Sequence, residues 1–231
     1  MKWFLAAVLL STLCSAQQTP AVPAVTRQAS VRFDFEWSQG FPWQKYTIVV
    51  QSNGKARFDG TPQPEGSYDT DPFHQDFTIP EASREKLFAL AQNLNYFRGD
   101  FDSHLKHVAK TGVKTLQYDS PQIKSSTSYN WSKNPDVDEL TKYFEGVANT
   151  IDYGCKLQFQ QRFDKLGMDK RIKELQYLQA SDEVRELQII QPILRKIADD
   201  PNVMNISRQS AERLLRSISD SPRLEPSPAA Q

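Results

Sequence analysis

Two histidines with acidic neighbours come closest to a metal site or a catalytic centre in this sequence. His104 and His107 follow Asp100 and Asp102, and imidazole and carboxylate groups are common zinc ligands. A spacing of three residues places both imidazoles on one side of the chain only within a helix, whereas residues 99–112 have the composition of a loop. The spacing therefore favours solvated loop side chains, and we expect neither a metal nor another cofactor.

Signatures of nucleophilic catalysis or phosphate binding do not occur in the sequence. It contains no Gly-x-Ser-x-Gly, no His-Glu-x-x-His and no glycine-rich phosphate loop, with nine glycines in all. The carboxylates of Asp34 and Glu36 fall on the wet side of a predicted strand, where alternation requires polar residues anyway. We therefore favour a non-catalytic protein. A secreted hydrolase that uses carboxylates or the loop of His104 and His107 is the alternative.

Five aromatic residues form the more suggestive set for binding. Trp37, Phe41 and Trp43 bracket one loop, whereas Tyr129 and Trp131 end a predicted strand. Aromatic rings gathered at one end of a sheet could stack on a sugar ring or contact a peptide. Trp37 and Trp131 also fall on the apolar side of their strands, so burial in the core is the competing interpretation.

The first sixteen residues have the three-part layout of a secretory signal peptide. Lys2 precedes an apolar run over residues 3–13, and Ala16 is the small residue that a signal peptidase needs. We expect cleavage between Ala16 and Gln17 and a secreted or periplasmic mature protein. A lipid anchor at Cys14 is less favoured, because the residue before it is leucine rather than a small one. The apolar run is shorter than the roughly 20 residues that span a bilayer, so no integral membrane segment is expected after cleavage.

The overall composition is that of a globular protein with a balanced surface. Lys+Arg and Asp+Glu number 28 each, and cleavage would remove Lys2 and leave 27 − 28 = −1. This balance argues against nucleic acid as a partner, because phosphate binding needs a basic surface. Cys155 would be the only cysteine left after cleavage. We therefore expect no disulfide scaffold and a small buried hydrophobe at that position.

Alternation of apolar and polar residues predicts the strands that position these side chains. Asn53-Gly54 lies between two alternating runs and predicts a hairpin. A three-residue loop of Ser52, Asn53 and Gly54 places Phe58 opposite Ile48, so the larger apolar side chains share one face and the glycine adopts the left-handed conformation. Further strands are expected at residues 31–37, 73–79, 113–118 and 122–131.

Helical periodicity takes over after about Asn134. Before that point, one helix is expected over residues 80–94, with a capping box formed by Thr78 and Glu81. Asn134 caps a second helix, which is expected to end at Gly154. Three later helices are expected. The first covers residues 155–180, the second begins near Ser181 and is kinked at Pro192, and the third covers residues 207–219.

These elements predict an α+β fold, in which an antiparallel sheet with one or two packed helices is followed by a C-terminal helical extension. The expected division is a signal peptide at 1–16, a flexible leader at 17–29, a sheet domain at 30–153, the extension at 154–219 and a disordered tail at 220–231. One sheet face would carry many charged side chains, which are costly to bury. We therefore expect the extension helices to pack mainly on one another.

The first hairpin also carries a resemblance to a known family. The segment from Gly40-Phe41-Pro42 through Tyr46-Thr-Ile48 and Asn53-Gly54 to Phe58-Asp-Gly60 resembles a domain family of unknown function found in bacterial secreted proteins and lipoproteins. By the order of its elements, the match covers residues 31–153. Many members carry a cysteine before the proline, where this chain has Ser38, Gln39 and Phe41, so no role of that cysteine is carried over. The resemblance implies an exported α+β domain, and we expect a binding module of the cell envelope whose partner is an envelope protein or a small ligand.

Overall fold

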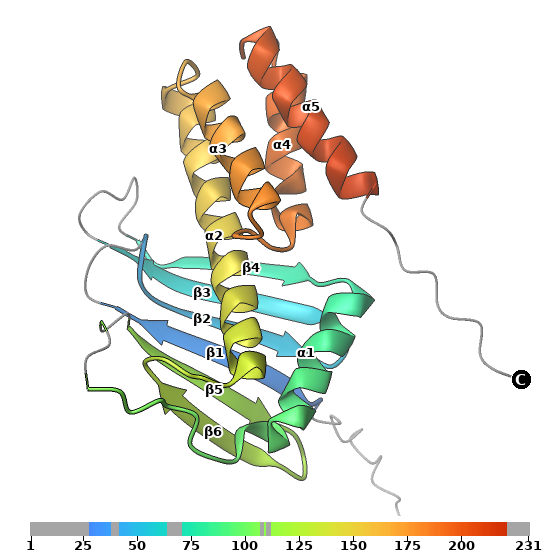
Figure 1. Cartoon of the computed structure of the whole chain (residues 1–231). Coiled ribbons are helices and arrows are strands. Elements are labelled where there is room, and N and C mark those ends of the chain that lie inside the picture. The colour runs from blue at the N-terminus through green and yellow to red at the C-terminus, as the bar shows by residue number, and fades with distance from the viewer. Residues whose placement is uncertain (1–27, 38–41, 64–70, 107–108, 110–111, 221–231) are drawn as a thin grey trace, which may run out of the picture.

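A six-stranded antiparallel sheet with the strand order β4-β3-β2-β1-β5-β6 forms the base of the molecule (Figure 1). This computed structural model describes residues 28–37, 42–63, 71–106, 109 and 112–220. The expected signal peptide therefore lies outside it, as does the expected tail except for Asp220, which belongs to a helix. The strands are β1 (Ser30–Glu36), β2 (Trp43–Gln51), β3 (Lys55–Pro62), β4 (Phe73–Thr78), β5 (Val113–Asp119) and β6 (Lys124–Tyr129).

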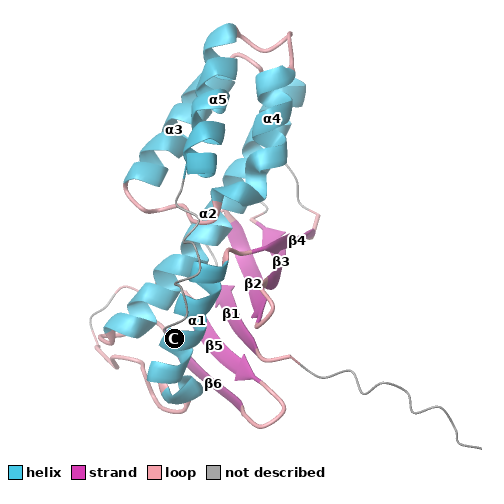
Figure 2. Ribbon diagram, turned by 90° about the vertical axis from the view of Figure 1, so that its right-hand side faces the viewer, coloured by secondary structure: helices cyan, strands magenta, loops and turns pink. Residues whose placement is uncertain are grey.

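Helices cover one face of this sheet and then extend beyond it. They are α1 (Glu81–Asn93), the 3-10 turn η1 (Asn95–Phe97), α2 (Pro135–Phe163), α3 (Met168–Ala180), the 3-10 turn η2 (Leu187–Ile190), α4 (Gln191–Asp199) and α5 (Asn205–Asp220). Figure 2 shows α1 and α2 on one side of the sheet, whereas no described helix covers the opposite side. The predicted α+β class with a helical C-terminal part is thus confirmed. Within the described ranges, no helix combines the length and apolarity needed to cross a membrane.

The first hairpin has the predicted register. Ile48 pairs with Phe58 and Val50 with Ala56, which leaves a three-residue loop between β2 and β3. Gly54 has a φ of +82°, in the left-handed region where a side chain would be strained. Alternation along these strands directs the apolar side chains to the helix-covered face.

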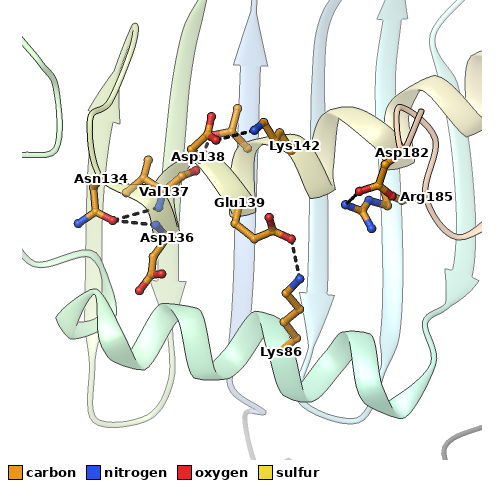
Figure 3. Close-up of polar contacts among 10 residues, drawn as sticks. Lys86, Asn134, Asp136, Val137, Asp138, Glu139, Lys142, Asp182 and Arg185 are labelled. Atoms are coloured by element: carbon orange, nitrogen blue, oxygen red, sulfur yellow. Dashed lines mark hydrogen bonds and ion pairs between the residues drawn. The ribbon is translucent and has the colours of Figure 1, made fainter. Parts of the chain in front are cut away.

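Aromatic and aliphatic side chains join α2 to the middle of the sheet. The rings of Phe33 and Phe144 stack with their centroids 5.1 Å apart, and both side chains are fully buried. Figure 3 shows how α2 begins: the Asn134 side chain accepts hydrogen bonds from the backbone N–H groups of Asp136 and Val137, at 2.9 and 3.3 Å. The predicted cap at this position is therefore confirmed.

The start of α1 differs from the prediction. Pro80 is the N-terminal cap residue, and no side chain caps the helix, so the proposed capping box of Thr78 and Glu81 is wrong. Thr78 still belongs to β4, where it pairs with Lys55. An ion pair of 2.6 Å between Lys86 and Glu139 joins α1 to α2 at the surface (Figure 3).

Helix α2 does not end at Gly154, as the sequence had suggested, but continues to Phe163. A Cβ atom on Gly154 would lie 2.6 Å from Ile190 Cγ2, and one on Gly146 would lie 2.6 Å from Arg185 Cγ. Both glycines thus permit the chain around η2 to pack closely against α2. The expected boundary between residues 153 and 154 lies inside this helix.

Pro192 was expected to kink a helix, but it lies in the first turn of α4. Residues 181–186 are not helical, and Glu186 has a φ of +56°. Proline is tolerated in a first turn because the N–H that it lacks has no partner within the helix. The single expected helix is therefore replaced by an irregular segment, η2 and α4.

The helices of the extension pack on one another and on the second half of α2 (Figures 1 and 2). Arg208 of α5 donates to the backbone oxygen of Ala198 in α4, at 3.1 Å. Near the end of α2, Lys165 pairs with Asp200 at 2.9 Å. The extension is therefore connected to the sheet layer by one continuous helix.

Candidate functional site

The structure buries two members of the aromatic set. Trp43 is 5% exposed and Tyr129 is 4% exposed, and both lie on the helix-covered face. The indole N–H of Trp43 donates to the backbone oxygen of Ala148 in α2 at 3.4 Å, and the Tyr129 hydroxyl lies 2.6 Å from that of Thr141. A Cβ atom on Gly60 would lie 2.8 Å from the Trp43 ring. These two aromatic residues are therefore part of the core.

The other described members of the set, Trp37 and Trp131, differ in their exposure. Trp37 packs half-buried against the core, and its backbone N–H donates to Gln44 at 2.8 Å. Trp131 is 41% exposed and follows β6. Phe41 lies outside the described residues. Among the described members of the set, Trp131 therefore has the most exposed side chain.

The loop of His104 and His107 contains a local network. His104 Nε2 lies 2.7 Å from Asp100 Oδ2, and Asp102 accepts backbone N–H groups from His104 and from Asn130 of the β6 end, at 2.6 and 2.7 Å. These backbone hydrogen bonds lower the pKa of Asp102, and the one from Asn130 has the larger effect. His107 lies outside the described residues, and among those described no three His, Cys, Asp or Glu side chains gather as a metal site would require. Asp102 therefore holds the loop against the sheet.

The uncovered side of the sheet, which we call the open face, carries the polar side chains of alternate residues. The predicted wet positions of the strands are confirmed there. Its central side chains are Arg32, Asp34 and Glu36 of β1, Lys45 and Thr47 of β2, Arg57 and Asp59 of β3, and His74 and Asp76 of β4. Strands β1 to β4 follow one another both in the chain and in the sheet, so the antiparallel pairing of successive strands places these side chains side by side.

Asp34 is the centre of the hydrogen bonding on this face. Its carboxylate accepts from Arg32 at 2.7 Å, from the Thr47 hydroxyl at 2.5 Å and from the Gln117 amide at 2.9 Å. The three donors come from β1, β2 and β5, which are neighbours in the sheet. Asp34 therefore ties three strands together and has little acceptor capacity left for a ligand.

A second network lies on the outer strands β3 and β4. His74 Nδ1 is 2.6 Å from Asp59 Oδ1, and Arg57 donates to Asp76 at 3.1 Å. The hydrogen bond to Asp59 raises the pKa of His74, and the one from Arg57 lowers the pKa of Asp76. The pairs follow from the register, in which Asp59 faces His74 and Arg57 faces Asp76. The sequence spacing did not predict that His74 and Asp59 would interact, because 15 residues separate them.

A hollow of about 420 Å³ lies on the open face where β1 and β3 end and β2, β4 and β5 begin. Its polar lining includes Asp34, Glu36, Lys45, Thr47, Asp59, Thr61, His74 and Thr115, with Val113 as an exposed apolar neighbour. In the described part of the chain, Glu36 and Lys45 take part in no ion pair or side-chain hydrogen bond. The hollow therefore contains polar side chains that are already hydrogen-bonded, together with two side chains of opposite charge that have no partner among the described residues.

On the covered side of the sheet, a buried lysine lies near a partly exposed glutamate. Lys114 Nζ is 3.9 Å from Glu145 Oε1 and donates to the backbone oxygen of Asn130 at 3.2 Å. Burial lowers the pKa of Lys114 and raises the pKa of Glu145. Lys114 also lies 5.7 Å from the centre of the Phe35 ring. This pair lies beneath α2 rather than in the hollow, so it belongs to the packing between sheet and helix.

The open face is a surface of charged and polar side chains. Its carboxylates and imidazole are solvated, and Asp34, Asp59 and His74 already have partners.

A search of protein-family models gives no match to this chain, and neither does a search of curated proteins. The resemblance of residues 31–153 to a family of exported domains therefore stays a prediction.

Proposed function

We propose that this protein is exported and acts outside the cytoplasm as a non-catalytic binding module, with the open face as its ligand surface. The observation that carries the proposal is the hollow of about 420 Å³ on a sheet face that no described helix covers. Small-ligand sites commonly have volumes of about 300–1,000 Å³. The other face of the sheet packs against the core beneath α1 and α2.

The polar groups support binding over catalysis. The side chains of His74 and His104 are 46% and 71% exposed, and each is hydrogen-bonded to an aspartate. Their pKa values are raised by these aspartates, so a smaller fraction of each imidazole is unprotonated and free to act as a base near neutral pH. Catalytic acids and bases are commonly tuned by burial in a cleft. Neither exposed histidine has that environment, so the hydrolase remains the alternative.

Export is supported by the sequence of the first sixteen residues and by the family resemblance of residues 31–153. A charged start, a short apolar run and Ala16 form the layout of a cleavable signal. The ligand is then a component of the envelope or of the medium, either a small molecule or part of a protein.

Amide chemical-shift mapping of residues 17–231 tests this function. Small sugars, amino acids and short peptides are added in turn, and we expect shifts to concentrate at the open face, around Thr47, Asp59 and Thr115. Amides of α2 serve as internal controls. Shifts centred on Trp131 would move the site to the aromatic set. Hydrolysis of an ester, amide or glycoside probe that is lost in His104→Ala would favour the hydrolase instead.

A further inference from the structure

We propose that the hollow binds a short peptide with free ends, whose ammonium group pairs with Glu36 and whose carboxylate pairs with Lys45. This inference rests on the proposed function, because it names the ligand class for the same surface. A hydrogen bond between two charged groups is about twice as strong as one between neutral groups. A ligand that carries both charges can use both side chains at once.

The row of residues at this end of the sheet gives the arrangement. Glu36 is the register partner of Lys45 on one side and of Val113 on the other, and Lys45 is the register partner of Thr61. Directly opposed residues have Cβ atoms about 4.5–5.5 Å apart. The two charges are therefore close enough for one small ligand to reach both.

Glu36 and Lys45 are also the charged side chains of the hollow that have no ion-pair or hydrogen-bond partner among the described residues. Asp34 already accepts hydrogen bonds from three side chains, and Asp59 uses one carboxylate oxygen for His74. Direct pairing of Glu36 with Lys45 would compete only weakly, because an exposed ion pair contributes about 0–1 kcal/mol. The charged ends of a ligand can therefore replace the direct pairing of Glu36 with Lys45.

The remaining lining suits peptide groups better than a sugar ring. The Thr61 hydroxyl can donate and accept hydrogen bonds, whereas the Thr47 hydroxyl, which already donates to Asp34, can still accept one from a peptide N–H. Val113 is 59% exposed and offers an apolar contact to a ligand side chain. Phe35 and Tyr46, which also border the hollow, are only 3% and 5% exposed. The third aromatic residue of the lining, Phe73, is partly buried and packs against Trp43 and Phe58 of the core, so no fully exposed ring borders the hollow for a sugar to stack on.

The test uses alanyl-alanine with free ends, its N-acetyl form and its C-terminal amide, titrated into residues 17–231 and followed by amide shifts. Glu36→Gln should weaken binding of the free dipeptide and of the amide about fivefold, and leave the N-acetyl form unchanged. Lys45→Gln should weaken binding of the free dipeptide and of the N-acetyl form, and leave the amide unchanged. Lys55→Gln, an exposed change on β3 outside the hollow, is the matched control and should change none of the three.

The outcomes separate this inference from the function on which it rests. If sugars or single amino acids shift the amides around the hollow and the dipeptide does not, the ligand class is wrong and the binding function stands. If no probe shifts the open face, both are wrong. Equal dipeptide affinity in Glu36→Gln, Lys45→Gln and the unaltered protein would overturn the assignment of these two residues. Melting temperatures within the error of the unaltered protein establish that the variants are folded.

Discussion

Replacing Gly154 with alanine should destabilise the protein, although the same change stabilises most helices. Gly154 lies in the interior of α2, where alanine is usually favoured by about 1 kcal/mol. Here the added Cβ would lie 2.6 Å from Ile190 Cγ2 and 3.3 Å from Ile193 Cδ1. Overpacking of a core typically costs about 1–3 kcal/mol. The two effects together predict a net loss of about 0–2 kcal/mol in the free energy of unfolding.

A matched exposed position in the same helix separates the effect of packing from that of helix propensity. Gln158 is exposed in α2, so the difference between Gln158→Ala and Gln158→Gly measures helix propensity alone. We expect alanine to be the more stable there by about 1 kcal/mol. Denaturant unfolding followed by circular dichroism gives both differences on one scale. Opposite signs at positions 154 and 158 would show that the contact with η2 dominates.

A double variant tests whether Ile190 is the obstructing residue. Ile190→Ala alone should cost about 2–5 kcal/mol, because it leaves a cavity. In the double variant with Gly154→Ala, the new methyl group occupies part of that cavity, so the loss should be smaller than the sum of the single losses by at least about 0.5 kcal/mol. Additive losses, or a gain of about 1 kcal/mol for Gly154→Ala, would refute the close approach of η2 to α2.

Three other properties should be measurable. Asn134→Ala removes both hydrogen bonds to the start of α2 and should lower the free energy of unfolding by about 1 kcal/mol; no loss would contradict the cap. An NMR titration should place the pKa of His74 above its ordinary value of 6.5, and Asp59→Asn should lower it. The stabilisation from this pair is therefore complete below pH 6.5 and is lost as the pH rises through the folded-state pKa, so an unshifted value in the unaltered protein would argue against the pair. Secreted protein should have the intact mass of a chain that begins at Gln17, whereas the mass of a lipid-modified Cys14 would overturn that start.

Much of the sheet could be predicted because strand signals are local. Alternation along β1 and the Asn53-Gly54 turn act over a few residues, and the structure has the strand and the β2–β3 register that they predicted. The cap of α2 is local too, since Asn134 reaches backbone groups only two and three residues ahead. Such features depend on neighbours in the chain, so the sequence contains the information that specifies them.

The candidate site was only partly predictable. The wet face of β1, with Asp34 and Glu36, follows from alternation and was expected. The link of His74 to Asp59 depends on which strands pair and in what register, and that pairing is set by the whole sheet. A sequence spacing of 15 residues between these two groups carries no signal of its own.

Glycine, proline and aromatic residues had meanings that only the tertiary structure decided. Gly154 was interpreted as a helix end, but η2 packs on it and the helix continues. Pro192 begins a helix rather than kinking one. Trp43 and Tyr129 could equally have formed a surface, and their burial depends on where α2 crosses the sheet. The sequence alone determined the strands and the start of α2, because their signals are local. Where the later helices begin and end, and which side chains are buried, were decided by contacts between elements far apart in the chain.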